Sequence, residues 1–202
     1  MHKLLTGHAT FKREFVEGSR TFLDELAAAH QSPDALYVGC ADSRVVPELL
    51  TSSAPGDLFV VRNVANLVPR AEKHDNSVGA ALEYAIEVLG IRHVVVCGHY
   101  GCGGVKAMIH QVDAAKFPEL FAWLADAAVS NAAANRLDVL DEEEHWELAV
   151  EENVLDQLVN LSTYPSVKER LVRGEMHLHG WVYDLRGDLY VYDVSSATFV
   201  HN

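Results

Sequence analysis

The sequence predicts an α/β fold in which a mostly parallel central sheet is flanked by helices and preceded by an N-terminal helical arm. Short apolar runs with the length of buried strands alternate with segments that have helical periodicity, and this alternation favours a parallel sheet. The chain has 202 residues, of which 49% are hydrophobic, so it can bury a sizeable core. We expect one domain over residues 1–202, with the helical arm at residues 1–30 and the α/β core at residues 35–202.

The arm and the first three strands follow from local patterns. Residues 11–27 place apolar side chains at helical spacing, which predicts an amphipathic helix. Residues 35–39 form a short apolar run that predicts a buried strand with Cys40 at its carboxyl end. Further strands are expected at residues 58–63, after a Pro-Gly-Asp turn, and at residues 93–97.

Helices and two more strands complete the expected core. Residues 77–89 predict a helix with Ser77 as its cap and Gly90 as its end. Helical segments are also expected at residues 105–110, 121–128 and 138–161, the last with apolar side chains on one face. The tail predicts two strands, at residues 176–184 and 189–194.

Charge and cysteine content narrow the function classes. The chain has 29 acidic and 16 basic residues, and its formal charge of -13 disfavours nucleic-acid backbones and anionic membranes. It lacks an apolar run of about 18 residues and the apolar segment of a signal peptide, so we expect a cytoplasmic protein. Three cysteines cannot all pair within one chain, and in a reducing compartment they remain available to a metal.

Cys40, His99 and Cys102 form the most informative pattern in the chain. Two thiolates and one imidazole suit zinc, and three protein ligands leave the fourth tetrahedral position free for chemistry. Cys40 and His99 both follow predicted strands, and the carboxyl ends of parallel strands are where ligands bind. His-x-x-Cys alone is a weak signal, and buried cysteines more often serve packing. Cys97 ends an apolar run and is expected in the core.

Asp42 and Arg44 lie two residues apart, directly after Cys40. In an extended segment their side chains project to the same side. They could form a surface ion pair of little energetic value. Alternatively, the guanidinium could hold a carboxylate beside the metal through a two-pronged hydrogen bond. Their position next to Cys40 favours the second interpretation.

Several segments together resemble the β class of carbonic anhydrases. They occur in the same order over nearly the whole chain, at residues 40–44, 55–66, 77–85, 98–104 and 179–184. The resemblance implies a lyase that reversibly hydrates carbon dioxide to bicarbonate and a proton by means of zinc-bound hydroxide. It also implies that Cys40, His99 and Cys102 ligate one Zn2+ per chain and that Asp42 and Arg44 form a dyad beside it.

The resemblance extends to substrate and partner contacts. It implies a substrate pocket formed partly across a dimer interface, in a homodimer or homotetramer, and lined by Gln31, Phe59, Tyr84 and Gly103. Residue chemistry alone suits Phe59 and Tyr84 almost as well to an ordinary hydrophobic core as to a substrate pocket. Gln31 would suit an exposed loop.

Some bacterial members of this class carry a noncatalytic bicarbonate pocket. The matching residues here are Tyr37, Arg62 and Tyr183. Tyr37 stands where those members have tryptophan. This difference favours the absence of the allosteric pocket.

Charge accounting predicts how such a metal centre behaves. Two thiolates cancel the charge of zinc, so we expect a less acidic bound water than in an all-histidine site, and activity that rises into mildly alkaline pH. Asp42 on zinc would close the fourth position, whereas Asp42 on Arg44 would leave it open. Two alternatives remain: hydrolysis of another small heterocumulene such as carbon disulfide, or a closed structural zinc site in a binding protein.

Overall fold

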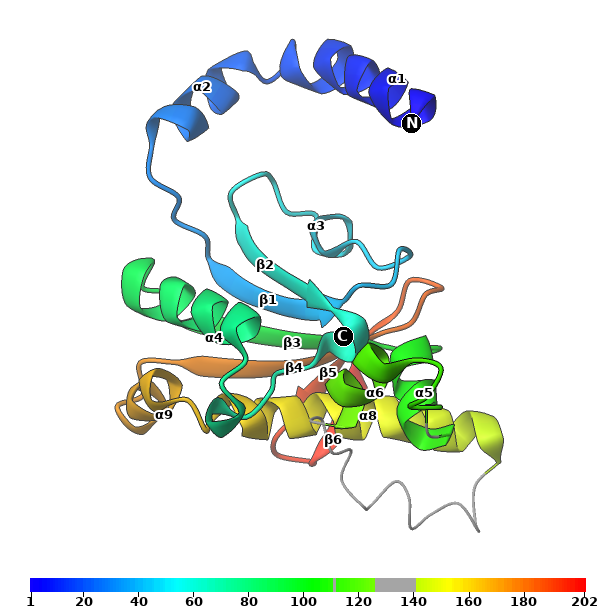
Figure 1. Cartoon of the computed structure of the whole chain (residues 1–202). Helices are drawn as coiled ribbons and strands as arrows, with labels where there is room; N and C mark the ends of the chain where they lie inside the picture. The colour runs from blue at the N-terminus through cyan, green and yellow to red at the C-terminus, as the bar shows by residue number, and fades with distance from the viewer. Residues whose placement is uncertain (111, 126–140) are drawn as a thin grey trace. The chain divides into compact units, whose positions relative to one another are not determined.

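A computed structural model describes residues 1–110, 112–125 and 141–202 (Figure 1). By its contacts the chain divides into two compact units, residues 1–32 and residues 33–202. This division falls close to the expected end of the helical arm, while the assignment of the whole chain to one domain stays a prediction. Within the described part of the chain, no helix combines the length and apolar character needed to cross a membrane.

The first unit is helical, as the sequence predicts, but its helical structure begins earlier. It contains α1 (His2–Phe11), a π-helical segment η1 (Lys12–Val16) and α2 (Arg20–Ala28). Neither α1 nor α2 buries a residue in the single chain. Several of their large apolar side chains are exposed, namely Leu4, Leu5, Phe11, Phe22 and Leu26.

The second unit is built on a six-stranded sheet in the order β2-β1-β3-β4-β5-β6. The strands are β1 (Ala35–Cys40), β2 (Leu58–Asn63), β3 (His93–His99), β4 (His177–Tyr183), β5 (Leu189–Asp193) and β6 (Thr198–His201). β1 to β4 are mutually parallel. β5 pairs antiparallel with β4, and β6 pairs antiparallel with β5. The predicted fold class is therefore confirmed. β3 is longer than expected, and the short edge strand β6 has no counterpart in the prediction.

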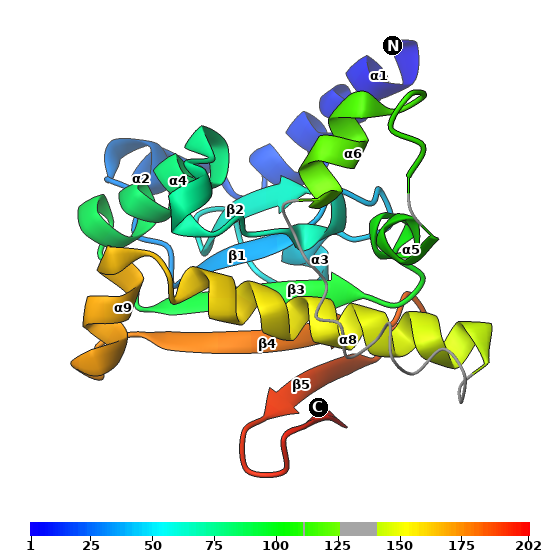
Figure 2. The ribbon, with the colours of Figure 1, turned by 60° about the horizontal axis from the view of Figure 1, so that its bottom comes forward.

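Helices and short helical turns connect the strands. They are α3 (Pro47–Leu50), η2 (Val64–Asn66), η3 (Ala71–Lys73), α4 (Asn76–Glu83) continued by η4 (Tyr84–Val88), α5 (Gly103–His110), α6 (Pro118–Ala125), α8 (Glu142–Leu161) and α9 (Pro165–Val172). The long α8 runs along β3 and β4 (Figure 2).

Helix boundaries correct two expectations and add one helix that was not expected. The cap of α4 is Asp75 rather than Ser77, because the Asp75 carboxylate accepts hydrogen bonds from the backbone N–H groups of Ser77 and Val78. Asp141 caps α8, so that helix starts later than residue 138; residues 126–140 lie outside the described residues. Pro165 opens the unpredicted α9 at a position where a helix tolerates proline.

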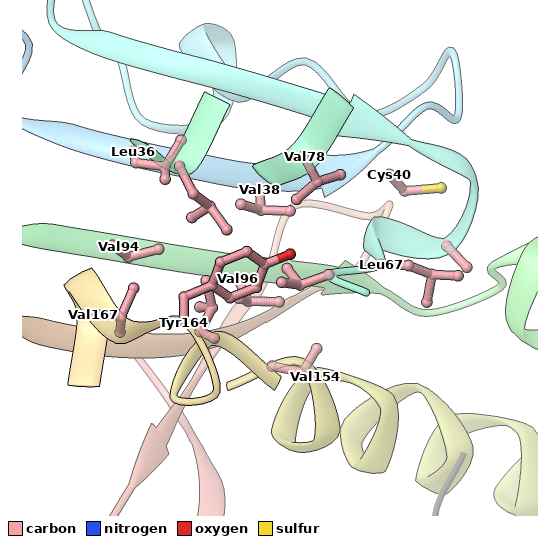
Figure 3. Packing of buried hydrophobic residues seen from close by; sticks show 14 of the residues in the cluster. Leu36, Val38, Cys40, Leu67, Val78, Val94, Val96, Val154, Tyr164 and Val167 are labelled. Atoms are coloured by element: carbon pink, nitrogen blue, oxygen red, sulfur yellow. The ribbon is translucent and has the colours of Figure 1, made fainter. Parts of the chain in front are cut away.

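The core lies on both faces of the parallel strands. On one face Val94 and Val96 of β3 pack with Leu36 and Val154 (Figure 3). On the other face Cys97 packs with Tyr37 and Val95. Cys97 is buried, as expected, and its thiol donates to the Gly98 carbonyl at 3.4 Å. Burying each large apolar side chain contributes about 1.5–3 kcal/mol, so this packing fixes the strand ends that carry the functional side chains.

Candidate metal centre

Cys40, His99 and Cys102 meet at one edge of the sheet. Cys40 ends β1 and His99 ends β3, and these neighbouring strands are parallel, so their carboxyl ends lie together. Cys102 follows a short turn and immediately precedes α5. The potential ligand atoms of all three buried residues lie within 4.8 Å of one another, and the two sulfur atoms are 3.8 Å apart. The structure thus brings together the three residues selected from the sequence.

Two glycines give this turn its geometry. Gly101 has a φ of 71°, a left-handed conformation that allows the chain to turn between His99 and Cys102. A Cβ atom at Gly104 would lie 2.8 Å from the Cβ atom of Ala65, so only glycine lets α5 approach η2 this closely. Gly101 therefore permits the short His-x-x-Cys spacing, and Gly104 permits the close packing of the helix that follows Cys102.

The His99 ring is set up as a metal ligand. Its Nδ1 atom lies 3.0 Å from the Tyr100 carbonyl, which can only accept a hydrogen bond, so Nδ1 carries the proton. The Nε2 atom then carries a lone pair. Among the residues that the structure describes, this buried Nε2 has no hydrogen-bond partner. A buried nitrogen left in this way is costly unless a ligand such as a metal ion completes it.

The Cys40 and Cys102 thiols also favour the binding of a cation. A hydrogen bond from Cys102 lowers the pKa of the Cys40 thiol, helped by His99 and by the backbone N–H groups of Asp42 and Ala65. The same contact with Cys40, followed by burial, raises the pKa of Cys102. The pair therefore loses its first proton easily and its second with difficulty. A bound divalent metal would supply the charge that stabilises two thiolates, so this donor set fits such an ion.

Asp42 faces the same cluster, and Arg44 holds it. The Asp42 Oδ1 atom accepts from the Arg44 Nε and backbone N–H groups, each at 2.9 Å, and Oδ2 accepts from Nη2 at 2.6 Å. Oδ2 also lies 3.8 Å from the His99 Nε2 atom. The guanidinium keeps the pKa of Asp42 well below its usual range. Asp42 is thus paired with Arg44 while remaining beside the three potential ligands.

Backbone supports of the cluster were not anticipated from the sequence. Arg62 donates from Nε to the Cys40 carbonyl at 3.0 Å and from Nη2 to the Asp42 carbonyl at 2.7 Å. Asn153 of α8 is fully buried and donates to the Ala65 carbonyl at 3.0 Å. Ala65 has a φ of 65°, a strained left-handed conformation for a residue with a Cβ atom. Asn153 therefore holds the backbone whose N–H group points to the Cys40 sulfur.

Unlike the predicted metal ligands, the four predicted substrate residues do not meet at one point of the single chain's described residues. Phe59 and Tyr84 stack with ring centroids 6.0 Å apart. Phe59 pairs in register with Leu36, which lies about 13 Å along β1 from Cys40. Gly103 is exposed at the start of α5, next to Cys102. Gln31 is exposed in the first unit.

Tyr37 and Tyr183 pack in the same small core cluster, and Arg62 lies close enough to Tyr37 to interact with it electrostatically. Tyr37 is completely buried in the small core cluster. Tyr183, with Arg44, borders a cavity of about 220 Å³ that Tyr37 and Arg62 do not line. The Arg62 guanidinium is committed to two backbone carbonyls.

Comparisons with known proteins show which family this chain resembles. The family model described as "Carbonic anhydrase" matches residues 35–189. A carbonic anhydrase of Pseudomonas aeruginosa is 39% identical over 201 residues, covering 99% of this chain and 91% of that protein. A carbonic anhydrase of Synechocystis is 38% identical over 203 residues, covering 99% of this chain and 74% of that protein.

Solved structures define the class. The β-carbonic anhydrase CcaA superposes with a TM-score of 0.96 at 37% identity, covering 100% of this chain and 99% of that one. A Coccomyxa β-carbonic anhydrase in complex with acetazolamide gives a TM-score of 0.80 at 34% identity, covering 93% and 83%. The fold is that of the β-carbonic anhydrases, and the cluster of Cys40, His99 and Cys102 fits a metal site. The chain belongs to the carbonic anhydrase family.

Proposed function

We propose that this protein catalyses the reversible hydration of carbon dioxide to bicarbonate and a proton, with one zinc ion held by Cys40, His99 and Cys102. The observation that carries this proposal is the convergence of three buried donors beside a carboxylate that is already paired with Arg44. Three protein ligands leave one tetrahedral position for water or substrate.

The donor set favours zinc among divalent metals. Thiolate and imidazole ligands suit zinc, whereas carboxylate and carbonyl oxygens suit magnesium or calcium. Zinc in such a centre acts as a Lewis acid and makes water a nucleophile near neutral pH. Because two thiolates neutralise the charge of the ion, we expect activity to rise into mildly alkaline pH.

Asp42 and Arg44 divide the remaining work. Asp42 stays ionised and can accept a hydrogen bond from the attacking water, which orients that water toward the substrate carbon. Arg44 donates hydrogen bonds to both carboxylate oxygens of Asp42, so it competes with the metal for that carboxylate. In this role Arg44 is a positioning residue that keeps the fourth ligand position available.

We further propose that Gln31, Phe59, Tyr84 and Gly103 line the substrate pocket in a homodimer or homotetramer. The separation of Phe59 from Cys40 along the sheet supports a pocket that combines residues of two copies. A Sordaria macrospora structure described as tetrameric β-carbonic anhydrases superposes with a TM-score of 0.85 at 29% identity. The exposed apolar side chains of α1 and α2 also suit burial against another copy. Light scattering measures the mass directly; a monomer would contradict this arrangement.

The second bicarbonate site at Tyr37, Arg62 and Tyr183 stays a prediction, with its absence favoured. The burial of Tyr37 and the engagement of Arg62 support absence. Hyperbolic kinetics without inhibition by bicarbonate are expected. Sigmoidal kinetics lost in an Arg62→Ala variant that still folds would reverse this view. A cytoplasmic location is also proposed, supported by the three free cysteines, which a reducing compartment keeps as thiols.

Substrate choice is tested by comparing two heterocumulenes. Zinc-loaded protein is assayed for carbon dioxide hydration and for carbon disulfide hydrolysis under the same conditions. We expect rapid turnover of carbon dioxide and little of carbon disulfide. The reverse order would assign the protein to the alternative hydrolase function. Zinc binding with no turnover of either substrate would assign it to a structural role.

A further inference from the structure

Three histidines gather at the end of the sheet opposite to the metal centre. His93 is the first residue of β3 and His177 the first of β4, and the two are paired in register. His179 lies two positions further along β4, so its side chain is on the same face as that of His177. The strand directions in Figure 1 show that these amino ends lie away from the carboxyl ends that carry Cys40 and His99.

The His93 ring contacts the rings of both other histidines. His93 Nδ1 lies 3.0 Å from His179 Nε2. The His93 ring centroid is 5.0 Å from that of His177 and 5.3 Å from that of His179. His93 and His177 are exposed, whereas His179 is half-buried. The group is therefore accessible to an ion from solvent without unfolding.

The separation of the two ring nitrogens is close to what a shared metal ion requires. With zinc–nitrogen bonds of about 2.0–2.1 Å and tetrahedral geometry, two ligating nitrogens stand about 3.3 Å apart. Without an ion, an N–H group of one ring must donate a hydrogen bond to the lone pair of the other. A metal ion can replace that proton if the two rings tilt, so that both nitrogen lone pairs point to an ion beside the line that joins them.

The surroundings of His179 favour its neutral form. Burial, together with the positive charge that His93 and His177 carry when protonated, lowers the pKa of His179. Three imidazole nitrogens suit zinc, copper and nickel. The formal charge of -13 also favours the accumulation of cations around the chain.

One ring must still turn before all three can ligate. Among the described residues, the Cys40 cluster is the group whose ligand atoms already lie close enough together for one ion. His177 stacks on His93 and has to rotate about its side-chain bonds to present a nitrogen. Its exposure makes that rotation inexpensive, so we expect weaker binding here than at the Cys40 cluster.

We propose that His93, His177 and His179 form a second binding site for a divalent transition-metal ion of the zinc type, bridging the amino ends of β3 and β4. An ion bound there would tie two neighbouring strands together and stabilise the folded state by mass action. This site is independent of the carbon dioxide chemistry proposed above.

The test counts zinc ions in protein whose Cys40 cluster is already filled. Zinc-loaded protein is dialysed against micromolar free Zn2+ at about pH 7.5, where histidine is mostly neutral, and bound zinc is measured. Wild-type protein should hold two ions per chain, and H93Q and H177Q should each hold one. The matched control H30Q, which changes an exposed histidine of the first unit, should hold two.

A second readout separates loss of the ion from loss of the fold. His93 and His177 are exposed, so both variants should fold and keep wild-type hydration activity. Added zinc should raise the melting temperature of the wild type and of H30Q but not of H93Q or H177Q. One ion per wild-type chain would overturn the proposal. So would a second ion that persists in both H93Q and H177Q.

Discussion

The two ends of β3 carry the same residue type in opposite situations. His99, at the carboxyl end, is buried, and its Nε2 atom has no hydrogen-bond partner among the described residues. His93, at the amino end, is exposed, and its ring contacts His179. The structure fixes the first ring before any ligand arrives, while the second can adjust. The comparison shows that burial and backbone support, more than residue type, distinguish a prepared metal ligand from an adaptable one.

The carboxyl end owes its rigidity to neighbouring elements. Arg62 bonds to the Cys40 and Asp42 carbonyls, and Asn153 bonds to the Ala65 carbonyl. At the amino end, His177 donates a backbone hydrogen bond to the Arg92 carbonyl, but the described ring contacts of the three histidines are those of His93 with His177 and His179. Outer partners of this kind typically change metal affinity or activity 10–100-fold when removed, which makes the difference between the two ends measurable.

Removing a thiolate from the prepared end should have the largest effect. In Cys40→Ser we expect metal affinity to fall by more than about 100-fold, because a direct ligand matters more than the outer partners. Hydration activity should disappear with the metal. Cys97→Ser is the matched control, since Cys97 lies on the same sheet but packs in the core and should leave zinc content at one ion in the Cys40 cluster. Zinc analysis and stopped-flow assays decide; full activity in Cys40→Ser would contradict the ligand assignment.

Freeing Asp42 should have the next largest effect. In Arg44→Ala the carboxylate loses its two-pronged partner and can occupy the fourth ligand position. We expect hydration near neutral pH to fall roughly 10–100-fold while zinc stays bound. Arg70→Ala, which breaks the exposed Arg70–Glu72 ion pair, is the control and should leave hydration activity and bound zinc unchanged. Near-normal turnover in Arg44→Ala would refute the positioning role.

Asn153 tests whether backbone support matters for the metal. Asn153→Ala leaves the Ala65 carbonyl without this donor, at a cost of about 1–3 kcal/mol in the free energy of unfolding. We also expect roughly 10-fold faster zinc release, because the Ala65 N–H group no longer stays fixed toward Cys40. Asn160→Ala removes a bond to Gln157 from the same helix and should leave zinc release unchanged. Equal release rates in both variants would reduce Asn153 to a purely structural residue.

The adaptable end should show the smallest effect, in the pH dependence of stability. The pKa of His179 is lowered in the folded protein, so the unfolded chain binds more protons as pH falls. Its contribution is therefore present above the usual pKa of 6.5 and decreases as pH falls below that value. In His179→Gln the melting temperature should decline less between about pH 7.5 and 5.5. Identical pH profiles for wild type and variant would contradict this linkage.

The sequence predicted the fold class and the metal donors because both follow local signals. Apolar runs marked β1 and β2 to within a residue, and their carboxyl ends located Cys40. The pairing of Asp42 with Arg44 followed from their spacing. Asp75 was missed as a cap because Asp75 and Ser77 are both good capping residues, and only the backbone geometry of α4 distinguishes them.

Contacts between residues far apart in the sequence could not be predicted from local sequence patterns. Arg62 reaches a carbonyl 22 positions away, and Asn153 reaches one 88 positions away. Neither contact leaves a periodic signal, because a backbone carbonyl accepts from any suitably placed donor. Likewise, the meeting of His93 with His177 depends on the register of β3 against β4. Contacts of this kind can be identified only once the three-dimensional arrangement of the strands is known.

The central claim is that Cys40, His99 and Cys102 hold zinc in an open, catalytic arrangement. Stopped-flow measurement of carbon dioxide hydration tests it most directly, on metal-depleted and zinc-reconstituted protein between about pH 6.5 and 9. We predict no hydration without zinc, recovery on reconstitution, and a rate that increases toward alkaline pH. Hydration that is independent of zinc, or reconstituted folded protein that remains inactive across this range, would contradict the account.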